Sequence, residues 1–472
     1  MKSNKLILIL STLVSVVSVG CSPEDNLVKY SYHSAIQGRK EFDIKDEFFY
    51  EDSMFAYLDE TCFSYDLAKM AALAVDSSKN NRLEGKVVTK TEEGNIFTQL
   101  GFENTKYITL NANDYEEDKT DLTAFYISNK KFNYDGEKYQ VFSVAVVGSR
   151  GPIDFVSNFD IGIDNSNYIL NEGSHKEWVN RDNHKGYDVT SNRVSKKIDE
   201  YLGQYQNKDY KTIMYLCGHS RGGAISNILG KEFTDRNIKT FSYAIAAPAC
   251  VSFERNNDYK NLFVISNKND LVPYLPPQDY GFQTYGITYE FAMEDYADTW
   301  NTMCPDYEYE HSNVDAVKTF LTDVFKNRVY SYTIPSEFED CESRAFETEA
   351  EANVEHQKFV DLYKEGTLEH VHTKVGPVTK NEDDEYEFSL TSSPAFLFDL
   401  VNSILLGKGN IVSIIIDALP FLNRYLPDFI DFAIDFIEID LMPKILMSHL
   451  CSGYLILIKA MEDNDLAKWK IN

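Results

Sequence analysis

A strand, a tight turn and a helix follow one another without interruption in the middle of the sequence, and this unit constrains the fold most. Residues 212–217 form an apolar run of strand length, residues 218–222 read GHSRG, and a helical pattern extends over residues 221–234. A continuous apolar run that ends at a glycine is typical of a strand buried on both faces. We therefore expect a sheet that is covered by helices on both sides.

The neighbouring segments repeat this alternation of strands and helices. Residues 141–147, 240–246 and 261–266 are further apolar runs, and residues 186–202 have the spacing of an amphipathic helix. Strands that alternate with helices are typical of a parallel sheet. The sequence therefore predicts an α/β fold with a mostly parallel central sheet flanked by helices.

Composition and charge exclude several classes of protein. Of the 472 residues 43% are hydrophobic, which is enough for a large core and excludes a disordered chain. The net charge is −28, whereas nucleic-acid binding requires clustered Lys and Arg. An acidic surface also repels anionic lipid headgroups. We therefore expect any contact with lipid to depend on apolar surface or on a covalent anchor.

Residues 1–20 have the pattern of an export signal. Two lysines precede an uncharged run over residues 6–19, which is too short to span a bilayer comfortably. The run ends in SVGC, which resembles a bacterial lipobox, although Ser18 stands where Leu is preferred. We therefore expect an exported lipoprotein at the cell surface, anchored to the membrane through a lipid on Cys21. Plain secretion and an uncleaved anchor are the alternatives, and residues 21–51 are interpreted as a tether.

The six remaining cysteines contain no CxxC pair, which argues against a thiol-ligated metal site. Cys217 and Cys250 lie in apolar strand-like runs, and we expect them to be buried thiols. Cys304 and Cys341 are candidates for a disulfide. No metal or organic cofactor is implied, and nothing in the sequence indicates an oligomeric state.

Ser220 lies at the centre of the turn between the strand and the helix. The glycines on either side, Gly218 and Gly222, allow the strand and helix to approach closely, and a strained turn of this kind exposes a nucleophilic hydroxyl. The N-terminus of the helix, where Arg221 supplies a backbone N–H, favours a developing negative charge. The motif predicts a nucleophilic serine, and an ordinary tight turn is the alternative.

A nucleophilic serine needs a base, and the base needs an orienting carboxylate. Asp270 closely follows the strand at residues 261–266, at the edge where open α/β sheets build their sites, so we predict that it is the acid rather than a simple turn residue. Among the nine histidines, His219 is excluded as the base because it adjoins Ser220. His449 precedes an apolar helix that would hold its ring, whereas His311 lies in an acidic segment. We predict His449 as the base, with His311 as the alternative.

Four motifs together resemble the class 3 lipase family of α/β-hydrolases. The sequence HKGY from His184 resembles the family's His-x-Gly-Phe strand end, GHSRGG its nucleophile elbow, and NDLVPYLPP its acid motif. His449 with Tyr454 five residues later fits its terminal motif. The resemblance covers about residues 60–320 and the last 30 residues. It implies an α/β-hydrolase fold and a Ser-His-Asp triad that cleaves carboxylic esters of lipids, either acylglycerols or phospholipids.

The resemblance also implies an oxyanion hole built from the N–H of Arg221 and the backbone or hydroxyl of Ser149. Here the sequence departs from the family, because residues 146–149 read VVGS where the family usually has Phe-Arg-Gly-Thr. A different alignment of this segment with the family pattern would place Pro152 at the donor position. Proline has no N–H to donate, but the spacing to the following Asp-Phe pair favours Ser149. A catalytically silent binding protein, a thioesterase and a peptidase remain alternatives, since a fold does not specify the reaction.

The family pattern divides the chain into a hydrolase core over residues 52–329, a helical insertion over residues 330–441, and a C-terminal part of the core over residues 442–472. Residues 394–447 are densely apolar, but no uncharged stretch there reaches the length of a membrane span. Our hypothesis is that these helices cap the site and form the acyl pocket. The alternative is a helical subdomain that only packs on the sheet.

Overall fold

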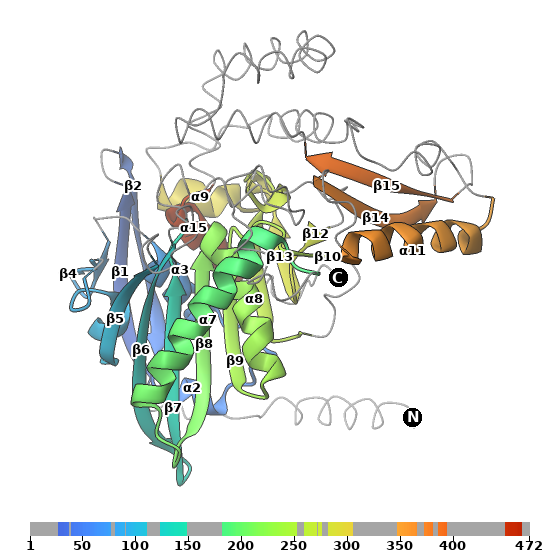
Figure 1. Ribbon diagram of the computed structural model, residues 1–472. Helices are drawn as coiled ribbons and strands as arrows, with labels where there is room; N and C mark the ends of the chain where they lie inside the picture. The colour runs from blue at the N-terminus through green and yellow to red at the C-terminus, as the bar shows by residue number, and fades with distance from the viewer. Residues whose placement is uncertain are drawn as a thin grey trace, which may run out of the picture.

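The computed structural model of the chain is drawn in Figure 1. It describes residues 27–36, 39–76, 81–89, 91–110, 123–148, 182–252, 259–270, 272–275, 282–304, 347–365, 372–380, 386–393 and 449–464. The predicted signal segment with Cys21 lies outside these residues, as do Ser149, Pro152, His311 and Cys341.

A seven-stranded sheet forms the centre of the molecule, in the order β13-β11-β9-β8-β7-β6-β5. The five strands from β7 to β13 are parallel, and β6 and β5 are antiparallel at one edge. The strands are β5 (Glu103–Leu110), β6 (Thr123–Tyr134), β7 (Glu137–Val146), β8 (Lys211–His219), β9 (Lys239–Ile245), β11 (Leu262–Asn267) and β13 (Ile287–Phe291). The predicted fold class, a mostly parallel sheet flanked by helices, is confirmed.

Helices cover both faces of this sheet (Figure 1). One face carries α7 (Lys185–Tyr205) and α8 (Arg221–Asp235), and the other carries α3 (Tyr65–Val75) and α15 (Cys451–Asp463). Successive side chains of a strand point to opposite faces, and in β8 Met214 and Leu216 pack with the first pair of helices while Tyr215 and Cys217 pack with the second. The strand is thus buried on both faces, as its unbroken apolar run predicts.

Shorter elements complete the described core. They are α2 (Met54–Tyr57), α4 (Ile96–Gln99), α9 (Ala297–Met303), the 3-10 turns η4 (Val272–Tyr274) and η6 (Met293–Tyr296), and the paired strands β10 (Val251–Ser252) and β12 (Phe282–Gln283). Cys217 and Cys250 are buried thiols, as expected. Cys304 is also buried, but its candidate disulfide partner lies outside the described residues.

The interpretation of residues 21–51 as a tether is wrong for the part that the structure describes. A four-stranded sheet in the order β2-β1-β3-β4 is built there from β1 (Val28–Ile36), β2 (Arg39–Tyr50), β3 (Arg82–Leu83) and β4 (Lys86–Val87). Ile44, Phe48 and Tyr50, which alternate along β2, are buried in the main core. A charged residue, Asp46, interrupts this alternation and hides the strand pattern.

Asp46 pairs with a lysine inside the protein. The Nζ of Lys69, on α3, lies 2.8 Å from Asp46 Oδ2 and 2.8 Å from Glu462 Oε2 of α15, and it donates to the carbonyl oxygen of Glu47 at 3.0 Å. Only 1% of the lysine side chain is exposed. Three segments distant in sequence, β2, α3 and α15, are therefore joined by one buried cation.

The predicted helical insertion is only partly described. Residues 330–441 include α11 (Glu349–Glu365), but also the antiparallel pair β14 (His372–Lys380) and β15 (Tyr386–Ser393), so this part is not wholly helical. The apolar residues 394–447, which the sequence analysis assigned to a cap, lie outside the described residues. Among the helices that are described, none has the length and apolar character needed to cross a bilayer.

Candidate active site

Ser220 occupies the turn between β8 and α8 in a strained backbone conformation. Its φ is 58° and its ψ is −133°, a region that residues with a side chain rarely adopt and that is found most often at functional sites. The turn is held from both sides, because the N–H of Ser220 donates to the carbonyl oxygen of Ile245 at 2.9 Å and its own carbonyl accepts from the N–H of Gly223 at 2.7 Å. The predicted nucleophile elbow depends on a strained strand-to-helix turn of this kind.

The glycines of the elbow are required by close backbone contacts. A Cβ atom on Gly218 would lie 1.9 Å from the carbonyl oxygen of Gly222, and one on Gly222 would lie 2.3 Å from the carbonyl oxygen of Val146. Real Cβ atoms do not approach other atoms this closely. The strand and the helix can therefore meet at this angle only without side chains at these two positions.

Asp270 follows β11 and is completely buried, at 0% exposure. Its Oδ2 atom accepts hydrogen bonds from Tyr454 Oη at 2.7 Å and His449 Nδ1 at 2.8 Å, and its Oδ1 accepts from the N–H of Val272 at 2.9 Å. A buried carboxylate needs such partners, because burial without them is costly. The predicted acid and the predicted base, 179 residues apart in the chain, are thus in direct contact.

The hydrogen bond to Asp270 determines which ring nitrogen of His449 carries the proton. Because a carboxylate accepts hydrogen bonds, the bond to Asp270 places the ring proton on Nδ1 and leaves Nε2 to accept one. The side chain of His449 is 19% exposed, whereas Asp270 is enclosed. The ring is therefore fixed at one side and accessible at the other.

Two residues of the site make contacts that the sequence does not predict. Tyr454 belongs to the terminal motif, and its hydroxyl donates to Asp270 and accepts a hydrogen bond from the N–H of Asn267 at 3.2 Å. His219 is predicted as part of the nucleophile elbow and excluded as the base, but its Nε2 also lies 2.7 Å from the carbonyl oxygen of His449. Since His219 immediately precedes Ser220, this contact brings the base to the elbow. The five-residue interval from His449 to Tyr454, which fits the family's terminal motif, was the available signal for the tyrosine.

The electrostatic environment keeps the His219 ring neutral. Burial and the neighbouring His449 lower the pKa of His219 to about 3. Its ring centroid lies 4.7 Å from that of His449 and 6.4 Å from that of Tyr454. A neutral histidine therefore packs between the elbow and the acid-base pair.

Of the two predicted oxyanion residues, Arg221 lies in the described part of the chain. The Arg221 guanidinium is buried, where Nη2 donates to Thr190 Oγ1 at 2.8 Å and Nη1 donates to Thr123 Oγ1. Its backbone N–H belongs to the first turn of α8, where N–H groups point out of the helix end. Ser149 lies outside the described residues. The preceding Gly148 does pass beside the elbow, since a Cβ atom there would be 3.3 Å from the Cβ of Ser220.

The HKGY motif begins a helix instead of ending a strand. His184 is the N-cap of α7, is fully buried, and stacks on Tyr187 with 4.1 Å between ring centroids. Its N–H donates to the carbonyl oxygen of Cys250 at 2.8 Å. The same helix carries Thr190, whose hydroxyl accepts a hydrogen bond from the Arg221 guanidinium. The helix that the motif begins therefore contacts the residue that follows Ser220.

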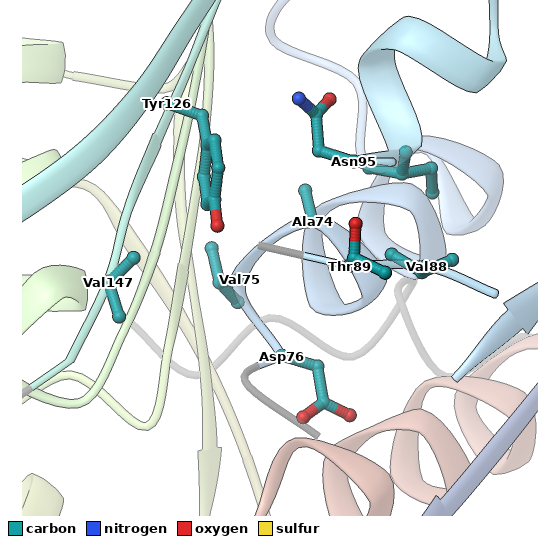
Figure 2. Close-up of a pocket in the computed structure, with 9 residues that line it drawn as sticks. Ala74, Val75, Asp76, Val88, Thr89, Asn95, Tyr126 and Val147 are labelled. Atoms are coloured by element: carbon teal, nitrogen blue, oxygen red, sulfur yellow. The ribbon is translucent and has the colours of Figure 1, made fainter. Parts of the chain in front are cut away.

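A small cavity of about 10 Å³ lies near this end of the sheet (Figure 2). Figure 2 shows Tyr126 of β6 and Val147 on one side and Val75, at the end of α3, facing them. The lining residues are Ala74, Val75, Asp76, Val88, Thr89, Asn95, Ile96, Tyr126 and Val147. Such a volume holds about one water molecule, which is too small for an acyl chain. In the described part of the chain, no group of His, Cys, Asp and Glu side chains is arranged to bind a metal ion.

Residues 143–280 match the model of the lipase (class 3) family. The matched segment contains Ser220 and Asp270 but not His449. Together with the mostly parallel, helix-covered sheet, this match identifies the fold as an α/β-hydrolase fold.

Solved structures of fungal lipases are also similar to this chain. A fungal lipase–inhibitor complex shares 20% identity over 40% of this chain and 66% of that chain, with a TM-score of 0.26. A Rhizomucor miehei lipase propeptide complex shares 20% sequence identity, and the match covers 40% of this chain and 57% of that chain, with a TM-score of 0.26. The Lip2 lipase from Yarrowia lipolytica shares 14% sequence identity, and the match covers 51% of this chain and 80% of that chain, with a TM-score of 0.29. The matched regions span less than two thirds of the first two chains.

Proposed function

We propose that this chain, whose residues 143–280 match the model of the class 3 lipase family, is a serine hydrolase that cleaves carboxylic esters of lipids. The proposal rests above all on one observation. A fully buried Asp270 binds the Nδ1 of His449, and the carbonyl oxygen of His449 is in turn bound by the residue next to a strained Ser220. Acylglycerols and phospholipids are the proposed substrates, in keeping with the family.

The proposed reaction is acyl transfer in two steps. In the first, Ser220 Oγ attacks the ester carbonyl while His449 Nε2 takes its proton, and the same proton is then given to the leaving alcohol. In the second, His449 takes a proton from water, the hydroxide attacks the acyl-serine, and the proton returns to Ser220 as the fatty acid leaves. Asp270 keeps the imidazole in the required tautomer and stabilises the imidazolium that forms.

Negative charge develops on the carbonyl oxygen in both steps. We propose that it is bound by the backbone N–H of Arg221 and by the backbone or hydroxyl of Ser149. Removing one such donor slows acyl-transfer enzymes by about 100- to 1,000-fold. The buried bonds of the Arg221 side chain to Thr123 and Thr190 support this role, because they fix the residue that carries the first of these donors.

A fluorophosphonate probe, which reacts with activated serines, tests the proposal on the purified full chain. We expect labelling of the wild type, none of Ser220→Ala, and hydrolysis of a p-nitrophenyl ester series by the wild type alone. A peptide panel and a thioester panel, run in parallel, test the two alternative enzyme classes. If wild-type protein neither reacts with the probe nor hydrolyses any ester, the chain is a binding protein and the proposed function is wrong.

We also propose that the chain is exported and anchored to a membrane through a lipid on Cys21. The support is the charged, then apolar, N-terminal pattern followed by SVGC. Cells that express the chain and are fed an alkyne-bearing fatty acid should label the wild type but not Cys21→Ala. Secreted, unlabelled wild-type protein would contradict the anchor but would leave the catalytic proposal unaffected.

A further inference from the structure

The side chain of His219 lies between the nucleophile and the acid-base pair. Its own backbone leads directly into Ser220, its Nε2 contacts the backbone of His449, and its ring packs near those of His449 and Tyr454. His219 therefore adjoins Ser220 in the chain and contacts His449, which lies 230 residues further along the chain.

The direction of the His219–His449 hydrogen bond follows from its chemistry. A carbonyl oxygen can only accept, so Nε2 of His219 carries the proton and donates it over 2.7 Å. The depressed pKa of His219 keeps its ring neutral near pH 7, so Nδ1 carries no proton. The contact is thus a neutral N–H donor aimed at the backbone of the catalytic base.

Two neighbouring rings pack beside that of His219. The centroid of the His449 ring is 4.7 Å from it and that of the Tyr454 ring is 6.4 Å from it. Both neighbours are bound to Asp270 Oδ2. The donor therefore packs against groups that are themselves held by the buried carboxylate.

A single hydrogen bond does not fix an imidazole. The bond from His449 Nδ1 to Asp270 holds one atom of the ring, about which the rest could tilt, and a small misplacement of a catalytic group is costly to rate. A second bond, to the carbonyl oxygen of the same residue, holds the backbone from which this ring extends. It also ties His449 to the residue that precedes the nucleophile.

We propose that His219 is a positioning residue, whose Nε2–H bond to the His449 carbonyl sets the distance and angle between the catalytic imidazole and Ser220. This inference rests on the proposed ester hydrolysis. Its alternative is a role in packing alone, in which only the volume of the ring matters.

Gln and Met at position 219 separate the two roles, because they have similar length and volume and only Gln has an N–H donor. Relative to wild type, we expect His219→Met to lower kcat by about 10- to 100-fold with little change in KM, and His219→Gln to recover most of that loss. Rates of fluorophosphonate labelling should follow kcat. His219→Phe, which keeps a ring without the donor, should behave like His219→Met and provides a second comparison if one variant does not fold.

Thermal unfolding of each variant completes the test. Equal kcat for the Gln and Met variants, or near wild-type kcat for His219→Phe, would overturn the inference, since packing alone would then account for the residue. Failure of the wild type itself to react with esters or with the probe would instead refute the proposed function. The two failures are therefore distinguishable.

Discussion

The hydroxyl of Tyr454 offers the sharpest test of how the acid is held. It donates to Asp270 Oδ2 over 2.7 Å, in a site where the carboxylate is 0% exposed. Hydrogen bonds to charged groups contribute about 1.5 to 3 kcal/mol to stability. Tyr454→Phe should therefore lower the free energy of unfolding by about 2 kcal/mol.

The expected effect on catalysis is smaller than removing the carboxylate. Asp270 keeps its bonds from His449 and Val272 when the tyrosine hydroxyl is lost, so the tautomer of His449 is preserved. The carboxylate can rotate, however, and we expect kcat to fall by about 10-fold because the imidazole is less well oriented. Urea denaturation and ester hydrolysis by the purified full chain measure the two effects.

Tyr285→Phe is the matched control. Its hydroxyl is equally buried and donates over the same 2.7 Å, but to the neutral side chain of Asn183, away from the triad. We expect this change to cost about 1 kcal/mol of stability and to leave kcat unchanged. Wild-type kcat in Tyr454→Phe, or an equal fall of kcat in both variants, would refute the reasoning.

Three further predictions concern the elbow, the buried lysine and pH. Gly222→Ala should lower the free energy of unfolding by about 3 kcal/mol in urea denaturation, because the added Cβ would lie 2.3 Å from a backbone oxygen. Gly203→Ala, in α7 with open space around it, should instead raise the free energy of unfolding by about 1 kcal/mol. Equal effects would contradict the close-contact argument. Lys69→Met should lower the free energy of unfolding by about 3 to 5 kcal/mol, because it leaves Asp46 buried without its cation. Lys231→Met, which breaks an exposed pair with Asp235, should lower it by about 0.5 kcal/mol. A small loss for Lys69→Met would show that water readily solvates Asp46. The folded pKa of His219, about 3, lies below its usual 6.5, so the unfolded chain binds the extra proton between these values and stability falls as pH drops through this window. We expect the wild type to lose about 1 to 2 kcal/mol more than His219→Gln between about pH 7 and pH 5, and identical pH dependence would rule out a His219 ring that the folded protein holds neutral.

The parts of the fold that were predicted from the sequence share one property: their pattern is local. β8 is an unbroken apolar run because both of its faces are covered, and the glycines of the elbow mark where two backbones meet. β2 was missed because Asp46 stands at a core-facing position, and the lysine that makes this acceptable lies on another element. No window of sequence around β2 contains that information.

The same distinction separates the site residues that could be predicted from those that could not. Ser220 and Asp270 follow strands of the sheet, so their positions could be deduced from the order of elements. The role of His219 depends on a backbone carbonyl 230 residues away, and that of Tyr454 on a carboxylate 184 residues away. Both contacts exist only because α15 returns to the sheet beside the elbow.

The return of α15 explains why the N-terminal segment is not a tether. α15 begins two residues after His449, and it is held by Lys69 through Glu462 and by a hydrogen bond of 2.9 Å between the buried Ser452 and Ser34 of β1. Neither contact lies in the segment that matches the family model. The strand pair at the start of the described chain therefore helps to dock the helix that follows His449. In the proposed triad, Ser220 and Asp270 lie in the segment that matches the family model, while the position of His449 depends on elements outside that segment.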